Sequence, residues 1–505
     1  MHGESIAKKG LRVKMYICIN TDMYTTTELF GKIHTSKKPL AVARNSLRRQ
    51  PLSQLEALCD RKFPSGWDHL NPDKANSRDR VYTPKITGLT FLSQILSPGS
   101  SCREAVRQVQ GAYALLPNAL AVSSDTSPYC QARARLELNR LTGLRCHLAA
   151  QMERNVSHGT RPWSRPIKVV DGTCFNLQDT PANRALYPQS TDQNPGCGFP
   201  QMRMVGTFSL QTGACLMHAD AAYRTSEGAL FRQLWPTFVS GDIVLADRLF
   251  DSYSNFAGLM HKGVDAIFSI NANRSLDFRR GRSVGRRDRL YTLIKPDHPA
   301  AGWSPEEWAA LPATITVRQL KAKIHNPKGR VKTITVITTL LDPILWPKEL
   351  LLLIFRHRWN VELFLDDIKT TLQMDLLSCR TPAMVQKELE MHLIAYNLTR
   401  AIMQEAALIC QVPLARISFK GTLDTMRQFG QTFARIPTRQ RKKRRDLYTR
   451  MLETMAKDLL PERPHRREPR CLKRRPKAFP FMTQPRHQMK DVLKSSRRKL
   501  KHSVA

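Results

Sequence analysis

Four residues in the segment 355–369 have the types and the spacing of a site that acts on a charged substrate. They are Phe355, Arg358, Glu362 and Lys369, separated by three, four and seven residues. At about 100° per residue on an α-helix, these intervals place all four in one narrow stripe. Almost every other direction of the segment is apolar, which predicts a buried helix in which unpaired charges would be costly. The stripe therefore either faces a cleft, or Arg358 and Glu362 form an internal i,i+4 salt-bridge ladder.

Two aspartates follow short apolar runs that predict central strands. Asp171 follows Ile167–Val170, and Asp247 follows Ile243–Ala246. Side chains at such strand ends project into the crevice where open α/β sheets place their sites. An aspartate followed by glycine after a strand is also common in turns. Each aspartate alone is therefore weak evidence for a site.

Several other side chains compete for a chemical role in the same region. Asp220, Asp242 and Asp251 are nearby carboxylates, and Asp242 opens its strand, so we expect it at the opposite edge of the sheet. Cys174 and Cys197 are candidate nucleophiles. The 11 cysteines are scattered, without a Cys-x-x-Cys pair. This pattern argues against a disulfide framework and a zinc knuckle, and we interpret both thiols as reduced and incidental.

Asp171, Asp247 and Glu362 together form a set of oxygen donors suited to Mg²⁺ or Mn²⁺, hard cations that prefer such ligands. Two such ions about 4 Å apart activate an attacking oxygen and stabilise the leaving one, which is phosphodiester chemistry. The composition agrees, because 80 Lys and Arg against 42 Asp and Glu leave a net charge of +38. This surplus favours nucleic acid as a partner over an acidic membrane surface or an acidic protein. Charge alone does not separate an enzyme from a histone-like protein.

The length and composition indicate an ordinary folded protein of two to four domains. Of the 505 residues, 41% are apolar and 24% are charged, as in soluble globular chains. The longest apolar candidate, 333–346, is interrupted by polar residues and falls short of the roughly 20 needed to cross a bilayer. No signal-peptide pattern follows the basic N-terminus. We expect an intracellular, cytoplasmic protein without membrane association.

The first half of the chain predicts helices followed by strands. The pattern from Lys37 to Glu153 is helical and rich in Arg, which favours DNA binding, with a helical scaffold as the alternative. Within it, Ser101 and Glu104 have the spacing of a capping box for a helix over Cys102–Val109. Strand-like runs begin near Ile167, and alternate with helical runs as in an α/β sheet.

The second half predicts an insertion, a helix and a tail. Alternating Thr, Val and Ile at 313–318 and 331–338 indicate strands, and Lys348–Gln373 is the strongest helical pattern. The segment Arg435–Ala505 carries 24 Lys and Arg against 6 Asp and Glu, with few large apolar residues, which predicts a flexible basic tail. The predicted division is an unassigned segment (1–35), a helical DNA-binding region (36–160), the first part of an α/β core (161–274), a β-rich insertion (275–345), the core helix that carries Glu362 (346–410) and a basic C-terminal region for DNA contact or dimerisation (411–505).

Read together, these segments resemble the DDE transposases of bacterial insertion sequences, in the family marked by a Tyr-Arg-Glu-Lys signature (insertion-sequence family 4 type). The stripe at 355–369 fits all three spacings of that signature and three of its four identities. The likeness covers roughly residues 45 to 486. It extends to Asp171-Gly172-Thr173, Ala246-Asp247-Arg248-Leu249-Phe250, Val81-Tyr82-Thr83-Pro84, Leu96-Ser97-Pro98, Ser101-Cys102-Arg103, Glu468-Pro469-Arg470 and Lys473-Arg474-Arg475-Pro476-Lys477.

The resemblance implies an α/β, RNase H-like catalytic core with a β-rich insertion, preceded by a helical DNA-binding region and followed by a basic tail. It implies two Mg²⁺ ions per active site, replaceable by Mn²⁺, held by Asp171, Asp247 and Glu362. It also implies a homodimer that pairs two DNA ends, located in the bacterial cytoplasm and on the nucleoid when bound. By position, the residues that it implies contact DNA are Phe355, Arg358, Lys369 and Arg248. Phe355 replaces the family's tyrosine, so it can stack or pack but cannot donate a hydroxyl hydrogen bond.

The function that the resemblance implies is transposition of a mobile element. The protein would bind terminal inverted repeats in double-stranded DNA and cleave a phosphodiester with water, and the freed 3′-OH would then attack the opposite strand or target DNA. Three alternatives stay open. They are a recombinase with a tyrosine or serine nucleophile, for which Tyr396 with Arg400 is an incomplete set, a basic DNA-binding protein without activity, and an RNase H-like nuclease that cuts without strand transfer.

Overall fold

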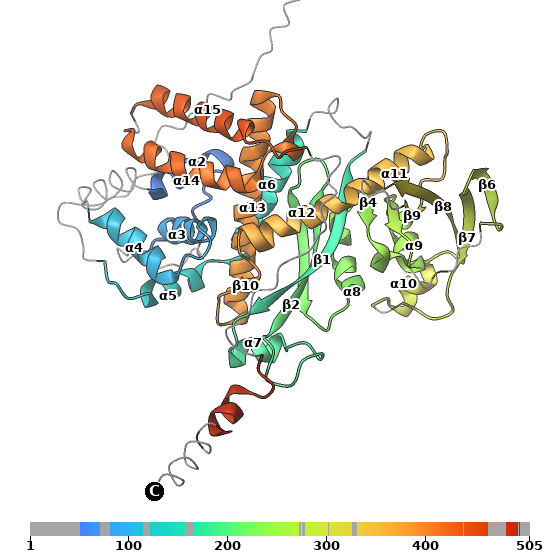
Figure 1. Cartoon of the computed structure of the whole chain (residues 1–505), viewed down its shortest axis with the longest axis horizontal. Coiled ribbons are helices and arrows are strands. Elements are labelled where there is room, and N and C mark those ends of the chain that lie inside the picture. The colour runs from blue at the N-terminus through green and yellow to red at the C-terminus, as the bar shows by residue number, and fades with distance from the viewer. Residues whose placement is uncertain are drawn as a thin grey trace, which may run out of the picture.

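The structure is a computed structural model of the 505-residue chain, in which a helical lobe lies beside a lobe built on one sheet (Figure 1). It describes residues 51–70, 81–114, 122–156, 165–271, 274, 278–300, 302–325, 331–437, 439–462, 481–492 and 494. The unassigned segment 1–35 and the tail motifs at 468–470 and 473–477 lie outside the described residues.

A single mixed sheet forms the frame of the second lobe. Its strands run in the order β3-β2-β1-β4-β5-β9-β8-β7-β6, and a short strand β10 pairs with the far end of β1. The bounds are β1 (Ile167–Leu177), β2 (Gln201–Ser209), β3 (Cys215–Ala222), β4 (Ile243–Ala246), β5 (Asp265–Ser269), β6 (Arg282–Gly285), β7 (Asp288–Ile294), β8 (Thr314–His325), β9 (Val331–Thr338) and β10 (Leu376–Leu377).

The first five strands have the RNase H-like arrangement. β2 is antiparallel to both β1 and β3, whereas β1, β4 and β5 are parallel to one another. The order β3-β2-β1-β4-β5 with only the second strand reversed is the topology of that fold, as the sequence predicts. The strands of the segment 275–345 do not form a separate sheet. They extend the same sheet. β9 pairs antiparallel with β5, and β8, β7 and β6 follow it in that order, each antiparallel to its neighbour.

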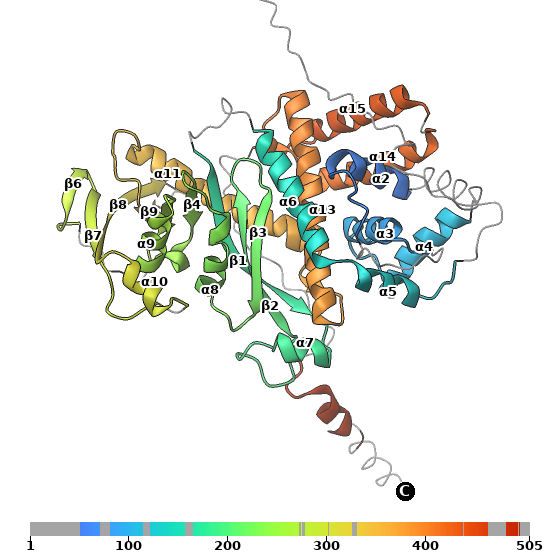
Figure 2. The same cartoon turned by 180° about the vertical axis from the view of Figure 1, so that it is seen from behind.

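Helices cover both faces of the sheet, and the pleat assigns residues to each face. On one face Ile167 and Val169 lie in a core shared with α11 (Lys348–Arg356), α12 (Asn360–Asp366) and α13 (Pro382–Cys410). On the other face Val170 lies in a core shared with α8 (Glu227–Gln233), α9 (Tyr253–His261) and α10 (Pro305–Ala310), which Figure 2 shows from behind. β4 is buried along its whole length, as a central parallel strand should be.

The helical lobe joins segments from both ends of the chain. Its helices are α2 (Pro51–Lys62), α3 (Pro84–Leu96), α4 (Cys102–Tyr113), α5 (Ser127–Arg135), α6 (Leu138–Arg154), α13, α14 (Phe419–Arg435) and α15 (Arg441–Lys457). The serine half of the predicted capping box is present, since the hydroxyl of Ser101 accepts a hydrogen bond from the amide of Glu104 at 3.2 Å. A small helix, α7 (Pro181–Leu186), lies near the C-terminal end of β1.

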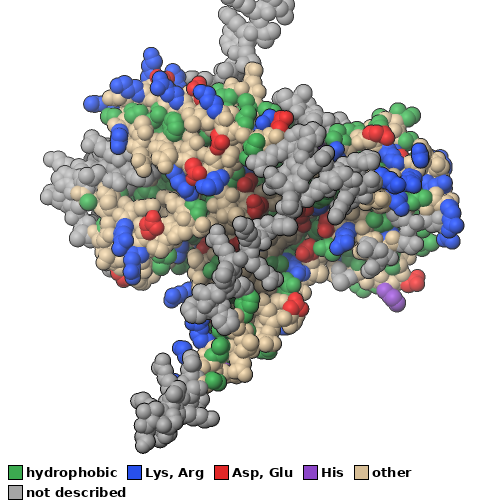
Figure 3. All heavy atoms as spheres, viewed as in Figure 1, with side chains coloured by type: hydrophobic (Ala, Val, Ile, Leu, Met, Phe, Trp, Pro, Cys, Tyr) green, Lys and Arg blue, Asp and Glu red, His purple; other side chains and the backbone are tan. Residues whose placement is uncertain are grey.

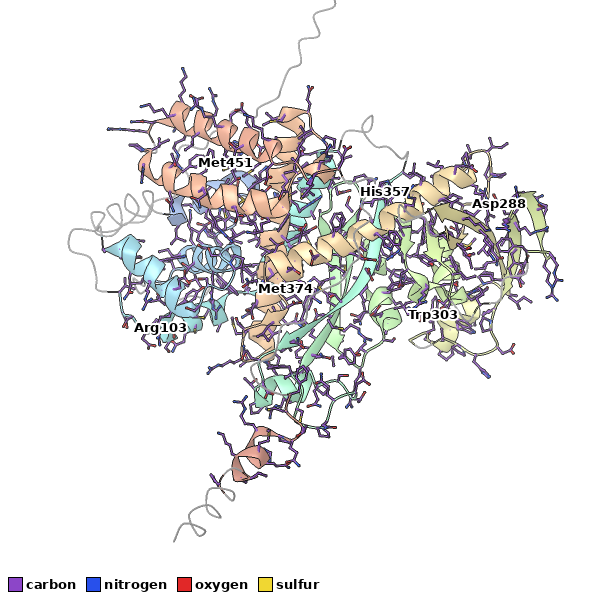
Figure 4. All side chains as sticks on the ribbon, in the orientation of Figure 1. Arg103, Asp288, Trp303, His357, Met374 and Met451 are labelled. Carbon is purple, nitrogen blue, oxygen red and sulfur yellow. The ribbon has the colours of Figure 1, made fainter. Side chains whose placement is uncertain are left out.

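The prediction of a flexible tail from Arg435 onward is wrong for its first part. α15 is an ordered helix that buries Met451, Leu452 and Met455 against the rest of the lobe, and Figure 4 labels Met451 there. The apolar spacing of these three residues is helical, but the five consecutive basic residues at 441–445 dominate the composition of the segment. No helix among the described residues is long and apolar enough to cross a membrane.

The prediction of one buried helix over 348–373 also needs correction. The segment is helical, but a 3₁₀ turn at His357–Trp359 separates α11 from α12, and a π-helical turn at Asp367–Thr371 follows α12. Leu353, Trp359 and Leu363 are 45%, 48% and 63% exposed. The helix therefore lies on the surface of the sheet with one side open, and does not run through the core.

Candidate active site

The register of the sheet brings the two predicted aspartates together. β1 and β4 are parallel neighbours in which Ile167 pairs with Ile243 and Val169 with Leu245. Continuing this register by two residues places Asp171 beside Asp247, and adjacent strands are about 4.8 Å apart. Both side chains have the same parity as Val169 and Leu245, so both point to the face that carries α12.

The two aspartates differ in how the backbone holds them. The sequence predicts that Asp171 ends its strand, but β1 continues to Leu177 and Asp171 is paired with Gly206 of β2 in mid-strand. Its Oδ1 accepts a hydrogen bond from the amide of Gly172 at 2.8 Å. Asp247 does end β4, and its Oδ1 accepts from the amide of Leu249 at 2.8 Å, capping a short 3₁₀ turn. One oxygen of each carboxylate is thereby fixed.

Arg358 connects Asp171 to the third predicted carboxylate. Its Nη1 lies 3.8 Å from Oδ2 of Asp171, and its Nη2 lies 3.1 Å from Oε1 of Glu362. Asp171 and Glu362 are thus held on two nitrogens of one guanidinium, although they come from distant parts of the sequence. Arg358 forms the predicted i,i+4 pair with Glu362, and it also reaches across to Asp171 on β1.

The environment raises the pKa of Asp171 to about 6. Burial is the largest cause, and the neighbouring charges of Asp247 and Glu227 add to it, while the Gly172 amide and the Arg358 guanidinium act in the opposite direction. Burial without full neutralisation favours the protonated carboxyl. Negative charge is therefore crowded at this end of β1 and β4. Figure 3 shows acidic side chains gathered near the middle of the face that carries α12.

Glu227, at the first position of α8, is a further carboxylate at this site, and the sequence alone does not single it out. Gly172 permits its approach, because a Cβ at that position would lie 2.6 Å from the Glu227 carboxyl carbon. Burial is the main cause of the raised pKa of Glu227, opposed by Arg203 and reinforced by Asp247. The only sequence signal is an acidic residue in the first turn of a helix, which is a common capping feature.

The remaining predicted DNA-contacting residues lie in different surroundings. Arg248 is exposed directly after Asp247. Lys369 is 3.4 Å from the Asp375 carboxylate and lies over the ring of Phe175 at 5.9 Å. Phe355 is only 8% exposed and belongs to the core under α11, so in this structure its ring packs and is not available to stack on DNA.

The competing carboxylates have structural partners. Asp242 is buried and paired with Lys168 at 2.6 Å, at the opposite edge of the sheet as predicted. Asp251 is paired with Arg274 at 3.0 Å, and Asp220 lies 3.4 Å from His218. The nine cysteines that the structure describes, Cys174 and Cys197 among them, are free thiols.

The site has the right chemistry for a hard cation but is not closed around one. Asp171 and Asp247 lie on neighbouring strands. Burial, reinforced by the charges of Asp247 and Glu227, raises the pKa of Asp171, and a bound cation would stabilise its charged form. Within the described residues, however, no three His, Cys, Asp or Glu side chains are close enough together to hold a metal ion. The reason is Arg358, which stands between Asp171 and Glu362.

Comparisons with known proteins find similarity to transposases. The family described as "Transposase DDE domain" matches residues 162–398, a range that contains all three carboxylates. The transposase InsG for insertion sequence element IS4, from Escherichia coli strain K12, is 26% identical over 253 residues, which cover 50% of this chain and 55% of that protein. The chain therefore matches about half the length of this curated relative.

Among solved structures, a piggyBac transposase synaptic complex with hairpin DNA, determined by cryo-EM, superposes with a TM-score of 0.40 at 9% sequence identity. The superposition covers 81% of this chain and 84% of that one. The family match covers the strands β1 to β5 and the segment that carries Glu362. Residues 162–398 of this chain match the transposase DDE domain family.

Proposed function

We propose that this protein is the transposase of an insertion sequence, that it binds the terminal inverted repeats of its element, and that it cleaves and joins DNA strands with Asp171, Asp247 and Glu362. The observation that carries the proposal is the single guanidinium of Arg358 on which Asp171 and Glu362 meet, with Asp247 on the adjacent strand. Three carboxylates from two strands and one helix form an oxygen-donor set.

The three carboxylates would hold two Mg²⁺ ions, which Mn²⁺ replaces. Such ions activate an attacking oxygen and stabilise the leaving oxygen of an in-line displacement. The side chains of this chain then have separate tasks. The amides of Gly172 and Leu249 orient the two aspartates, leaving the outer oxygen of each carboxylate for ligation. Arg358 and Lys369 neutralise phosphate near the cleaved end, and Arg248 is exposed beside Asp247 for the same purpose.

The cleavage that we propose has two stages. Water attacks the phosphodiester at the element end and frees a 3′-OH, and that hydroxyl then attacks a second phosphodiester in the opposite strand or in target DNA. No covalent bond to the protein forms at either stage. In agreement with this, Tyr396, a candidate nucleophile of a recombinase, is fully buried and donates its hydroxyl hydrogen to the carbonyl of Gly213 at 2.6 Å.

The partners follow from the same proposal. Double-stranded DNA is the substrate, and two copies of the chain pair two element ends in one complex. The helical region 36–160 is proposed to read the ends, and the segments 161–274 and 346–410 to form the catalytic core around the insertion 275–345. The basic region 411–505 would contact DNA or the second subunit. We propose that the protein acts in the bacterial cytoplasm, on the nucleoid.

The test is substitution of each carboxylate by its amide. We expect Asp171→Asn, Asp247→Asn and Glu362→Gln each to lower the cleavage rate by at least about 10³-fold, since each removes a ligand charge at the reacting centre. DNA binding, measured by gel shift on a duplex taken from the DNA that borders the gene, should stay within a few-fold of the wild type.

The matched control is Asp242→Asn, which changes a carboxylate at the opposite edge of the same strand. Cleavage by the folded control should persist. If the three variants cleave like the wild type, the site assignment is wrong. If no protein cleaves but all bind DNA equally, the alternative of a DNA-binding protein without activity is correct. Cleavage without any joined product would indicate a nuclease.

A further inference from the structure

An open cavity of about 620 Å³ lies at the other end of the helix that carries Glu362. It is formed where the turn between β6 and β7 and the middle of β8 meet the start of α11. Figure 4 labels Asp288 at this end and Met374 beyond the far end of the helix. The cavity is separate from the carboxylate site, and none of the three carboxylates lines it.

The lining of this cavity is strongly basic. Its cations are Arg286, Arg287, Arg318, Lys321, Lys323 and Lys348, against only Asp288 and Glu349. Among the described residues, no carboxylate forms an ion pair with Arg286, Lys321 or Lys323. Figure 3 shows Lys and Arg side chains gathered over β6, β7 and β8 on this face. An anion entering the cavity would therefore meet several cations that have no carboxylate partner.

A buried ion pair builds the floor of the cavity. Arg318 is fully buried and makes two contacts with Asp288, Nε to Oδ1 at 2.8 Å and Nη2 to Oδ2 at 2.6 Å. Its Nη1 donates to the carbonyl of Trp346 at 2.7 Å, which ties β7 and β8 to the loop before α11. Lys348 donates to the carbonyl of Arg286 at 2.7 Å and holds the β6–β7 turn. The cavity is thus fixed by internal bonds, while its rim stays available.

The cavity and the carboxylates share one face of the sheet. Arg318 and Ala322 have the same parity along β8 as Leu320, which packs in the core under α11 and α12. About 14 residues separate Lys348 from Glu362, and at 1.5 Å per residue this corresponds to roughly 20 Å along the helix. With about 3.4 Å per base pair, that length spans about six base pairs of duplex DNA.

From this geometry we infer that the cavity is a second DNA site, which holds backbone phosphate about six base pairs from the phosphodiester at the carboxylates. The inference rests on the proposed function for the identity of its ligand. The cations are arranged around an open cavity and not along a groove for bases, so they contact phosphate without reading sequence. The site fixes the path of the duplex, and the helix from Lys348 to Glu362 sets the distance between the held phosphate and the cleaved one.

The first experiment measures binding alone, in EDTA, on a 30-base-pair duplex of arbitrary sequence. The test variant is Arg286→Ala with Arg287→Ala, because both residues lie exposed in the β6–β7 turn that lines the cavity and neither side chain holds the floor. The slope of log affinity against log salt should fall by about 0.9 for each phosphate that the variant no longer neutralises. The control is Lys262→Ala with Lys457→Ala, two exposed lysines outside the cavity. Equal slopes in the two double variants would overturn the inference.

The second experiment locates the held phosphate on a duplex from the DNA that borders the gene. Neutral methylphosphonate linkages are placed one at a time along each strand, and binding is measured again. In the wild type we expect weakened binding for linkages about six base pairs from the cleavage point, and no such weakening in the Arg286→Ala, Arg287→Ala variant. Interference that is unchanged in the variant would contradict the inference. A flattened slope in a protein that never cleaves DNA would instead contradict the proposed function and leave the phosphate site standing.

Discussion

At the scale of single residues, Gly172 has a second role besides forming part of the sequence Asp171-Gly172-Thr173. It leaves room for the carboxylate of Glu227 beside Asp171, a position that a Cβ would fill. We predict that Gly172→Ala moves Glu227 away and lowers the cleavage rate, with little loss of stability because only the end of a flexible side chain must shift. Steady-state cleavage and thermal unfolding measure the two effects.

The control for this change is Gly228→Ala, one residue along from Glu227 in α8. A Cβ there meets nothing within 4 Å, and alanine favours a helix by roughly 0.5–1 kcal/mol over glycine. Its cleavage rate should equal that of the wild type. A Gly172→Ala protein that is as active as this control would mean that the placement of Glu227 does not matter for the reaction.

The residues of the site are predictable from the sequence to different degrees. Asp171, Asp247 and Glu362 can be named because a strand pattern and a helical spacing each mark them. The bridge from Arg358 to Asp171 is not predictable, since a spacing within one helix says nothing about its distance from a strand. The signature assigns Phe355 to DNA, yet the structure buries it, because an aromatic ring without a hydroxyl group satisfies the core equally well.

At the scale of secondary-structure elements, a buried polar cluster joins β3 to α6 and α13. Glu390 lies 2.9 Å from both Arg145 and His218, and His218 also lies 3.4 Å from Asp220. Burial alone would raise the pKa of Glu390, but the His218 hydrogen bond and the Arg145 charge lower it to about 2. For His218, burial acts to lower the pKa, and the hydrogen bonds to the two carboxylates raise it overall.

These shifts predict a pH window for stability. The lowered pKa of Glu390 contributes stability above its ordinary value of 4.5, which is lost as pH falls toward about 2. The raised pKa of His218 contributes stability below its ordinary value of 6.5, which is lost as pH rises through the folded value. Both contributions are complete between these two ordinary values, at about pH 5.5. Urea unfolding of the wild type across pH should show the cluster at its most stabilising there.

Glu390→Gln serves as the reference in the same measurement. It leaves the guanidinium of Arg145 buried without a counter-charge and removes one of the two carboxylates beside His218, which we expect to cost about 3–5 kcal/mol at pH 5.5. The difference from the wild type should shrink as pH is lowered toward 3. A difference in unfolding free energy that stays constant with pH would show that Glu390 does not cause the pH dependence of stability.

The sequence predicts elements well where periodicity is strong and poorly where it is not. The helical segment 348–371 and the strands β4, β8 and β9 follow their patterns, and β1 begins where its pattern begins but continues past Asp171. The 29-residue α13 does not emerge from the sequence, because it is buried on nearly all sides and carries polar residues such as Glu390, Asn397 and Arg400 within the core. Its partners come from distant segments, and no local pattern reveals them.

At the scale of the whole molecule, the net charge is unevenly distributed along the chain. Residues 463–505 contain 15 Lys and Arg against two acidic residues. Because α15 packs into the helical lobe, a truncation that tests the tail should end at Glu462 and spare that helix. We predict that it flattens the salt dependence of binding and weakens affinity for all sequences alike, since counterion release does not depend on sequence.

Preference for element ends should survive this truncation, because we assign that recognition to the helical region and the core. Salt-titrated gel shifts on end and random duplexes measure both quantities. An unchanged slope would rule out phosphate contacts by residues 463–505. If single-end binding is intact and only the complex of two ends fails to form, the segment pairs subunits.

The central claim is that the crowded carboxylates beside Arg358 drive metal-dependent cleavage of DNA without a covalent intermediate. The most direct measurement follows cleavage of a duplex from the DNA that borders the gene, in Mg²⁺, in Mn²⁺ and in EDTA, with the products resolved by denaturing gel and the protein tested for attached DNA. We predict cleavage in either metal, a free 3′-OH at the element end, no product in EDTA and no DNA on the protein. Cleavage that persists in EDTA, or DNA bound covalently to the protein, would contradict the account.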